Sequence, residues 1–208
     1  MTELESVVLR SERLRLVPTC RDYAEAIFET FTPAVTTFMY PASPTAIQET
    51  LDFLQRAEAA NQAGIDLQVA VFHNETGEFL GHAGLHGIRT RSPELGIWIK
   101  ETAHGHHYGR EAVTSLARWA LETLDFDYLK YPVDRRNIPS RRIPESLGGS
   151  VEAEYQVTNE AGNLLDLVEY RIYRETLASL LEGVFSHTEN YETQIQKMPE
   201  NSPKFENP

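Results

Sequence analysis

The spacing of apolar residues changes along the chain between strand-like runs and helix-like repeats. Apolar runs predict seven strands, at residues 14–17, 67–72, 78–88, 94–100, 128–133, 151–158 and 164–173. Helical spacing predicts helices that start near Asp22 and Ser43, and others at 108–124, after Asn137 and at 176–185. Turn-rich segments at 73–77 and 159–163 predict two antiparallel hairpins. This alternation predicts an α/β fold.

Polar residues and glycines indicate where the helices begin and end. Asp22 is predicted to cap a helix, with Glu25 three residues later completing a capping box. Pro44 suits a first helical position, and Gly64 is a natural terminator of the helix that follows. The helix at 108–124 repeats apolar side chains on one side, which predicts its packing face: Leu116, Trp119, Ala120 and Thr123.

The strand at 94–100 runs through a glycine-containing loop into the helix at 108–124. The loop reads His104-Gly105-His106-His107-Tyr108-Gly109. The first N–H groups of a helix have no intrahelical partner and carry partial positive charge, so this corner could hold a pyrophosphate. An ordinary strand–helix connection is the alternative, because a glycine pattern alone is a weak signal.

A second segment strengthens the first interpretation. It runs from Val133 to Gly149 and contains Asn137, Ser140, Ile143 and the pair Leu147-Gly148. Together the two segments resemble the GNAT superfamily of acetyl-CoA-dependent N-acetyltransferases, in the branch of the ribosomal-protein N-terminal acetyltransferases.

The resemblance rests on two motifs and on the start of the chain. The family loop Gln/Arg-x-x-Gly-x-Gly/Ala falls on 104–109 and continues into Arg110-Glu111-Ala112. The second motif, Asn-x-x-Ser-x-x-hydrophobic with a closing Leu-Gly-Phe, falls on 137–149. The segment 11–18, with Asp22 just after it, is similar to the first strand and helix of this branch. The likeness therefore covers about residues 7–173.

The resemblance implies a GNAT-type acyl-CoA N-acyltransferase fold: a mixed, mostly antiparallel sheet of about six to seven strands, flanked by helices in three layers. The domain is expected at 1–185. The resemblance also implies that an acetyl group moves from acetyl-CoA to a primary amine, by direct attack in a ternary complex. The amine would belong to a protein N-terminus or to a small molecule. A non-catalytic acyl-CoA-binding protein with this fold is the alternative.

The same resemblance indicates where coenzyme A would bind. The strand at 94–100 is expected to splay from the next strand, so that pantetheine bonds to its amides; Gly96 inside it is consistent with a bulge or a close backbone approach. The pyrophosphate would lie on the loop. The expected cofactor-binding residues are Ile97, Trp98, Ile99, His104, Gly105, His106, His107, Tyr108, Gly109, Arg110, Asn137 and Ser140.

Two residues are the catalytic candidates. Ser140 is predicted to contact the thiol end of the cofactor, with a helix cap as its structural alternative. Glu94 is predicted to accept the amine proton through water, because burial would raise its pKa; a solvent-facing glutamate is the alternative. Asn137 either bonds pantetheine or closes a turn. Glu111 is interpreted as a first-turn residue stabilised by the helix dipole rather than as a catalyst.

Four residues depart from the family pattern. His104 stands where the family has glutamine or arginine. His107 occupies the first motif glycine, and its Cβ disfavours positive φ, so either the loop differs or the imidazole helps to hold the anion. Gly149 replaces the closing aromatic residue. Pro144 lies inside the expected second-motif helix, which predicts that this helix is short, kinked or late to begin.

Composition and charge restrict the partners. The 208 residues include 19 basic and 31 acidic side chains, for a formal charge of −12. Nucleic acid is therefore not expected as a partner, whereas a cationic amine or basic peptide would be attracted. The single Cys20 excludes an intramolecular disulfide, and no targeting segment or membrane-length apolar run is evident. A cytoplasmic enzyme without a membrane partner is expected, and a homodimer is compatible with the sequence.

Two further interpretations concern metals and the C-terminus. Five histidines could suit a transition metal, but no metal-type cysteine or His-Glu-x-x-His pattern accompanies them, so no metal is expected: His82, His86, His104, His106 and His107. From Ser186 the chain turns polar and contains three prolines. A flexible tail is therefore expected at 186–208.

Overall fold

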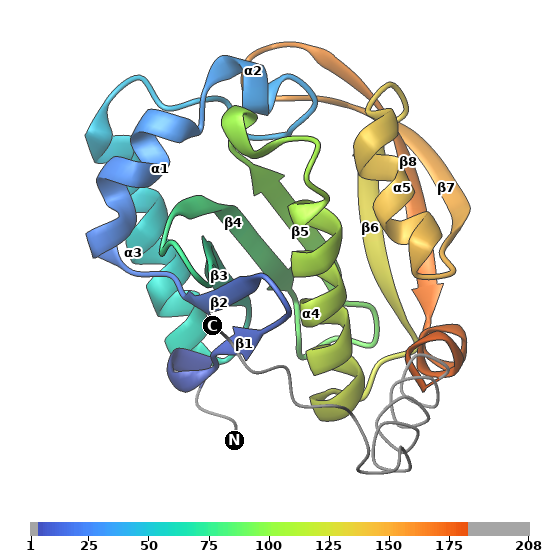
Figure 1. The fold of residues 1–208 in the computed structure, drawn as a ribbon. Helices are drawn as coiled ribbons and strands as arrows, with labels where there is room; N and C mark the ends of the chain where they lie inside the picture. The colour runs from blue at the N-terminus through green and yellow to red at the C-terminus, as the bar shows by residue number, and fades with distance from the viewer. Residues whose placement is uncertain (1–3, 183–208) are drawn as a thin grey trace, which may run out of the picture.

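The chain is organised around one eight-stranded sheet (Figure 1). A computed structural model describes residues 4–182. The strands are β1 (Leu9–Arg10), β2 (Leu14–Pro18), β3 (Leu67–His73), β4 (Phe79–His86), β5 (Glu94–Ile99), β6 (Tyr128–Asp134), β7 (Ser150–Thr158) and β8 (Leu164–Tyr173). Their order is β1-β2-β3-β4-β5-β6-β8-β7, and only the neighbours β5 and β6 are parallel. The predicted mixed, mostly antiparallel sheet is confirmed, with the short β1 as an additional strand.

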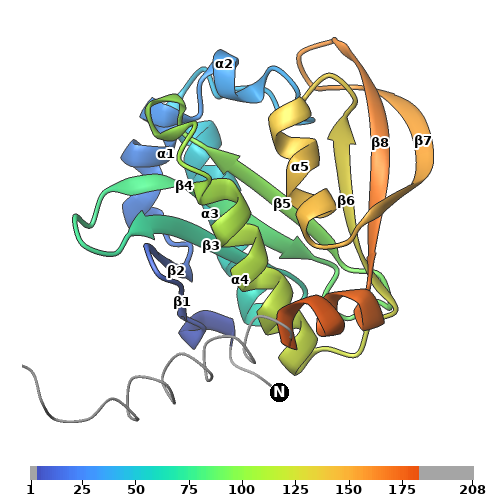
Figure 2. The same ribbon diagram turned by 45° about the vertical axis from the view of Figure 1, so that its right-hand side comes forward.

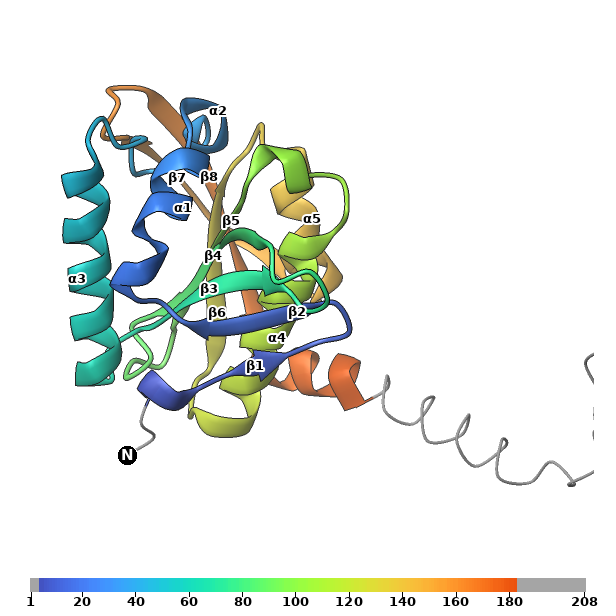
Figure 3. The same ribbon diagram turned by 60° about the vertical axis from the view of Figure 1, so that its left-hand side comes forward.

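Helices cover both faces of the sheet. They are η1 (Leu4–Ser6), η2 (Arg21–Tyr23), α1 (Ala24–Thr30), α2 (Pro33–Thr36), α3 (Ile47–Ala63), η3 (Glu101–Ala103), α4 (Tyr108–Thr123) and α5 (Ile138–Ser146). A last helix occupies residues 174–182. Figure 3 shows α1 and α3 on one side of the sheet and α4 and α5 on the other. The three predicted layers are therefore present.

The predicted start of the first helix is wrong. Asp22 lies in the 3₁₀ turn η2, and neither that turn nor α1 has a side-chain cap bond at its N-terminus. The chain thus enters α1 through a 3₁₀ turn, and Asp22 and Glu25 form no capping box.

The helix predicted to start near Ser43 corresponds to α3, which begins later than predicted. Its first residue is Ile47 rather than Pro44. Glu49 in its first turn binds back to Thr45, through the hydroxyl at 2.7 Å and the N–H at 3.2 Å. This pair sets the beginning of α3 more strongly than the preceding proline does. The predicted end at Gly64 is confirmed, since Gly64 takes a left-handed conformation with φ of 64°.

The core lies mainly between the sheet and α4. The buried side chains of α4 are Ala112, Val113, Leu116, Ala117, Trp119 and Ala120. Three of the four predicted packing residues are among them, but Thr123 is exposed and donates its hydroxyl hydrogen to the Trp119 carbonyl. A second cluster on the opposite face joins Ile27, Leu54 and Trp98.

The last described helix belongs to the domain. Leu177 and Leu181 are buried in the main core, and Arg174 donates to the carbonyls at the end of α4. The predicted helix at 176–185 is therefore present as far as Glu182, starting two residues early. The predicted boundary near 185 and the polar segment at 186–208 lie outside the described residues.

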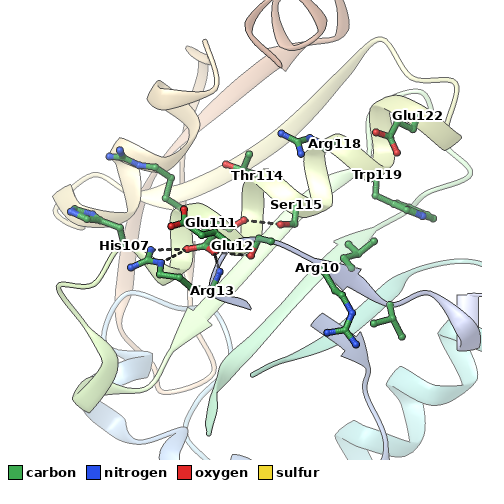
Figure 4. A pocket seen from close by; sticks show the side chains of 14 residues that line it. Arg10, Glu12, Arg13, His107, Glu111, Thr114, Ser115, Arg118, Trp119 and Glu122 are labelled. Carbon is green, nitrogen blue, oxygen red and sulfur yellow. Dashed lines mark hydrogen bonds and ion pairs between the residues drawn. The ribbon is translucent and has the colours of Figure 1, made fainter. Parts of the chain in front are cut away.

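Glu111 ties the first turn of α4 to the β1–β2 turn. Its carboxylate accepts from the Ser11 hydroxyl at 2.7 Å and from the Arg13 N–H at 2.8 Å, and it pairs with the Arg13 guanidinium at 2.6 Å. Burial raises the pKa of Glu111, but these hydrogen bonds outweigh it and hold the pKa below its usual value. Glu111 is thus a structural anchor, and it faces a surface hollow of about 540 Å³ between β1 and α4 (Figure 4).

Glu111→Gln should destabilise the fold by about 1.5–3 kcal/mol at neutral pH, the range for a hydrogen bond to a charged group. Because the folded pKa is depressed, this contribution is complete above the usual carboxyl pKa and is lost as the pH falls through the folded pKa. Urea unfolding from pH 7 to pH 3 measures it. Glu122→Gln, at an exposed position of the same helix, is the matched control. An equal loss for both variants, or a Glu111 effect that does not shrink in acid, would contradict the anchor.

Candidate functional site

The parallel strands β5 and β6 diverge after a single pair. Glu94 pairs with Lys130, and the Lys130 N–H donates to the Pro93 carbonyl at 2.8 Å. In the described chain, no further residue of β5 pairs with β6. The strands separate from that point toward the end of β5, as Figures 1 and 2 show from two directions. This divergence leaves one edge of β5 without a strand partner.

The backbone of β5 presents alternate amides to that open edge. The Lys100 N–H donates to the Leu80 carbonyl on β4, and Trp98, two residues earlier, is the register partner of His82 on β4. By alternation, the amide of Trp98 faces β4, and the amides of Ile97 and Ile99 face β6. The geometry therefore does not support Trp98 as an amide donor to a cofactor and retains Ile97 and Ile99.

The loop between β5 and α4 has the features of an anion cradle. Residues 104–107 are exposed, and Gly105 has φ of 82° with open space, free of atoms to 4 Å, where a Cβ would lie. Within the described chain, no group accepts a hydrogen bond from the backbone N–H of residues 107–110. Four neighbouring donors at a helix N-terminus can surround a phosphate oxygen.

His107 adopts a left-handed backbone conformation, which ordinarily favours glycine. Its φ is 63° and its ψ 15°, and it is the one non-glycine residue with positive φ among residues 4–182. A residue with a Cβ in this conformation carries strain of about 1–2 kcal/mol.

Side chains fix the ends of the loop. His104 Nε2 lies 2.7 Å from the Ile99 carbonyl at the end of β5. The His106 ring stacks on Tyr108, with the centroids 5.5 Å apart. A Cβ on Gly109 would lie 3.5 Å from Ile143 of α5 and 3.7 Å from Ile99, so this glycine sits where β5, α4 and α5 meet. The loop is therefore held directly beside the open edge of β5.

Asn137 and Ser140 have distinct positions on α5. Asn137 is the N-cap, because its side chain accepts from the Ser140 N–H at 3.2 Å. Ser140 is not the cap, so that alternative is wrong. Its hydroxyl lies 2.8 Å from the phenol of Tyr131 on β6.

Tyr131 was not among the residues predicted from the sequence. It is 3% exposed, and burial raises its pKa to about 12, with the Ser140 hydrogen bond acting in the opposite direction. The phenol thus keeps its hydrogen at neutral pH. The available signal was a tyrosine in a buried strand, which ordinarily requires a partner for its hydroxyl.

Glu94 lies where β5 and β6 meet but is not buried as expected. Its side chain is 39% exposed and lies 3.6 Å from the ammonium of Lys130. Trp98, four residues further on the same face, packs against Phe31 with ring centroids 4.8 Å apart. This face is the one covered by α1 and α3, opposite Ser140. Glu94 therefore remains a candidate for accepting the amine proton because of its place where β5 and β6 meet, and not because of burial.

The second-motif departures have local explanations. Pro144 does not end α5, which begins at Ile138 and runs to Ser146, so the helix is short but not late. The Gly149 N–H donates to the Pro144 carbonyl at 2.9 Å. A Cβ on Gly149 would lie 2.9 Å from that carbonyl, and one on Gly148 2.5 Å from Thr176. The turn therefore leaves little room for the family's aromatic side chain.

Other kinds of site are absent from the described part of the chain. Among residues 4–182, no group of three or more histidine, cysteine or acidic side chains is arranged to hold a metal. No helix in the same range has the length and apolar character needed to cross a membrane. The hollow beside Glu111 is lined by residues 8–13 and by α4 and includes His107 and Arg110 of the cradle, but no residue of β5, β6 or α5 lines it.

Comparisons with known proteins agree with this geometry. The family description "Acetyltransferase (GNAT) domain" matches residues 13–150. An uncharacterized N-acetyltransferase, p20, of Bacillus licheniformis is 23% identical over 174 residues, covering 82% of this chain and 98% of that protein.

Two solved structures illustrate the shared fold. One is RimL, a ribosomal L7/L12 alpha-N-protein acetyltransferase in complex with coenzyme A, with a TM-score of 0.71, 15% identity and coverage of 80% of this chain and 98% of RimL. The other is a GCN5-related N-acetyltransferase from Brucella melitensis, with a TM-score of 0.70, 18% identity and coverage of 86% and 84%. At these identities the likeness shows the fold.

His107→Gly should stabilise the free protein by about 0.5–1 kcal/mol, because relief of the left-handed strain exceeds the added chain entropy of glycine. Thermal and urea unfolding measure this change. His106→Gly is the matched control, since His106 has no positive φ and its replacement should not stabilise. A less stable His107→Gly protein would show that the imidazole makes contacts worth more than the strain.

Proposed function

The chain belongs to the GNAT acetyltransferase family, and we propose that it transfers the acetyl group of acetyl-CoA to a primary amine by direct attack in a ternary complex. The observation that carries the proposal is the open edge of β5. It joins a cradle of free amides at residues 107–110 to the hydroxyl pair of Ser140 and Tyr131. A long donor with an anionic end and a reactive end fits this arrangement.

The residues beside the open edge suit the parts of coenzyme A. The amides of residues 107–110 would bind the diphosphate, with His104, His106 and His107 of the exposed loop and Arg110 of the first turn of α4 close by. The amides of Ile97 and Ile99 would bind the pantetheine arm in the manner of an added strand. Asn137 supports this site by capping the helix that carries Ser140. When bound, acetyl-CoA supplies an acyl carbon activated as a thioester.

Ser140 and Tyr131 are placed to assist the departing sulfur. A leaving thiolate must be stabilised or protonated. The Ser140 hydroxyl can donate to it, and the buried Tyr131, which stays protonated at neutral pH, can donate to Ser140 in turn. The pair would therefore supply a hydrogen bond that strengthens as negative charge develops on sulfur.

The amine would approach from the other face of the sheet. Glu94 lies on that face where β5 and β6 meet, and its carboxylate favours an ammonium group near the gap. The formal charge of −12 acts in the same direction at longer range. An N-terminal peptide and a small-molecule amine both satisfy these features. The amine would thus attack from the face of α1 and α3 and the thiolate would depart toward the face of α5, which keeps the incoming amine and the departing thiolate apart.

A panel of amines tests the proposal. The protein is incubated with acetyl-CoA and with N-terminal peptides, polyamines or small primary amines, and released CoA is followed with a thiol reagent. Release that depends on both the protein and the amine, together with an acetylated product in the mass spectrum, is expected. Tight binding of acetyl-CoA without turnover on any acceptor would support the non-catalytic acyl-CoA-binding alternative instead.

Ser140→Ala should lower turnover by roughly 10–100-fold, because a hydrogen bond to a charged group contributes about 1.5–3 kcal/mol. Tyr131→Phe should lower it in the same direction and by less, since Ser140 remains. Affinity for CoA, measured by calorimetry, should change little in either variant. Ser146→Ala is the matched control on α5, because its hydroxyl donates to the Ile143 carbonyl of its own helix. A Ser140→Ala enzyme with unchanged kcat would remove Ser140 from the mechanism.

A further inference from the structure

His86 lies beside the meeting point of β5 and β6, on the face opposite Ser140. It is the register partner of Glu94 across the β4–β5 pair. Its ring lies over two glycines that face each other, with Nε2 3.0 Å from a Cβ position on Gly84 and 3.5 Å from one on Gly96. A side chain on Gly84 would crowd the imidazole. The ring therefore lies over Gly84 of β4 and Gly96 of β5, near the part of β5 where the open edge begins.

Polar neighbours hold this ring in one orientation. His86 Nδ1 lies 3.1 Å from the carboxylate of Asp66 and 3.0 Å from the amide nitrogen Nε2 of Gln68. A carboxylate only accepts and an amide nitrogen only donates, so the two contacts require opposite states of Nδ1. The Asp66 contact requires the hydrogen on Nδ1, and in that tautomer the Gln68 amide is turned by 180° from its placement here, so that its oxygen faces the ring. His86 Nε2 is thus left with the lone pair. Within the described residues it has no hydrogen-bond partner.

The supports of the ring are fixed in turn. Asp66 also accepts from the Gly87 N–H at 2.8 Å. Burial raises the pKa of Asp66, but the His86 and Gly87 hydrogen bonds outweigh it and lower the pKa, so the carboxylate stays charged. Gln68 is 6% exposed, and its backbone exchanges hydrogen bonds of 2.7 and 3.0 Å with the side chain of Asn61.

Three titratable groups lie around His86: Glu94, Asp66 and His82. Glu94 faces it from β5 and is paired with Lys130 of β6, and Asp66 faces it from the segment before β3. His82, four residues earlier on β4, is buried and stays neutral, because burial, with a smaller effect from His86, lowers its pKa to about 3. The His86 side chain is 45% exposed and therefore open to a ligand.

We propose that His86 accepts a proton from the acceptor ammonium through Nε2, with Asp66 as the positioning residue and Glu94 as the group that attracts the ammonium. The inference rests on the proposed function. The Nε2 lone pair takes one proton from R–NH3⁺, and the neutral nitrogen forms a bond to the thioester carbon. As the C–S bond breaks, a second N–H proton passes to sulfur through Ser140 and Tyr131, and His86 returns its proton to water.

The test combines kinetics with rescue. His86→Gln and His86→Ala should lower kcat about 10²–10⁴-fold, the usual contribution of a general base, while CoA affinity stays within about twofold of the parent. Added imidazole should restore part of the turnover of His86→Ala, which a purely structural role would not produce. Variants that keep parental kcat across the pH range would overturn the inference and leave the proposed function intact. A parent protein that releases no CoA with any amine would overturn both.

Asp66→Asn tests the positioning role while leaving the His86 side chain in place. Loss of the carboxylate should shift the acidic limb of the kcat/KM profile to lower pH, because the imidazolium loses its partner. The midpoint of the His86 ring titration, followed by NMR in the free protein, should fall with it. Asp52→Asn, on the exposed side of α3, should move neither quantity. An unchanged profile and midpoint in Asp66→Asn would contradict the role of Asp66.

Discussion

The separation of β5 from β6 after one residue pair is the constraint on which the rest of the site depends. Each strand is fully paired on its other side, β5 with β4 and β6 with β8 along its whole length. The sheet therefore consists of two well-formed halves that touch at Glu94 and Lys130. An unpaired strand edge inside a protein is costly unless something bonds to its amides. A pantetheine arm is a ligand of the right shape and chemistry for that edge.

The same separation gives the site two chemically different sides. Ser140 and Tyr131 stand on the side of α5, and Glu94, His86 and Asp66 stand on the side of α1 and α3. The proposed donors of hydrogen bonds to a departing anion are thus placed apart from the groups proposed to attract and deprotonate a cation. The glycines at 84, 96 and 109 allow side chains to pack closely around the site, because each has a side chain of another residue within 4 Å of its Cβ position.

Local motifs were sufficient to predict the strand, the loop and the helix that hold the free amides, whereas the separation of the two strands was implied by the family resemblance. The conformation of His107 was not predictable, because the cost of its Cβ had to be weighed against the fixed ends of the loop. Glu94 was expected to be buried, but the sequence does not reveal that Lys130 of another strand lies beside it. Tyr131 and the His86–Asp66 pair depend on contacts between segments far apart in the chain, which no single motif encodes. The second helix starts later than predicted because local hydrogen bonding at Thr45 prevailed over the general preference for proline at a first helical position.

Hydrogen–deuterium exchange of individual backbone amides, with and without saturating coenzyme A, tests the central claim most directly. We predict that the amides of Ile97 and Ile99 and those of residues 107–110 become strongly protected on binding. The Trp98 amide, which faces β4, should change little. Saturation of the protein with coenzyme A while the amides of Ile97, Ile99 and 107–110 exchange as in the free protein would contradict it.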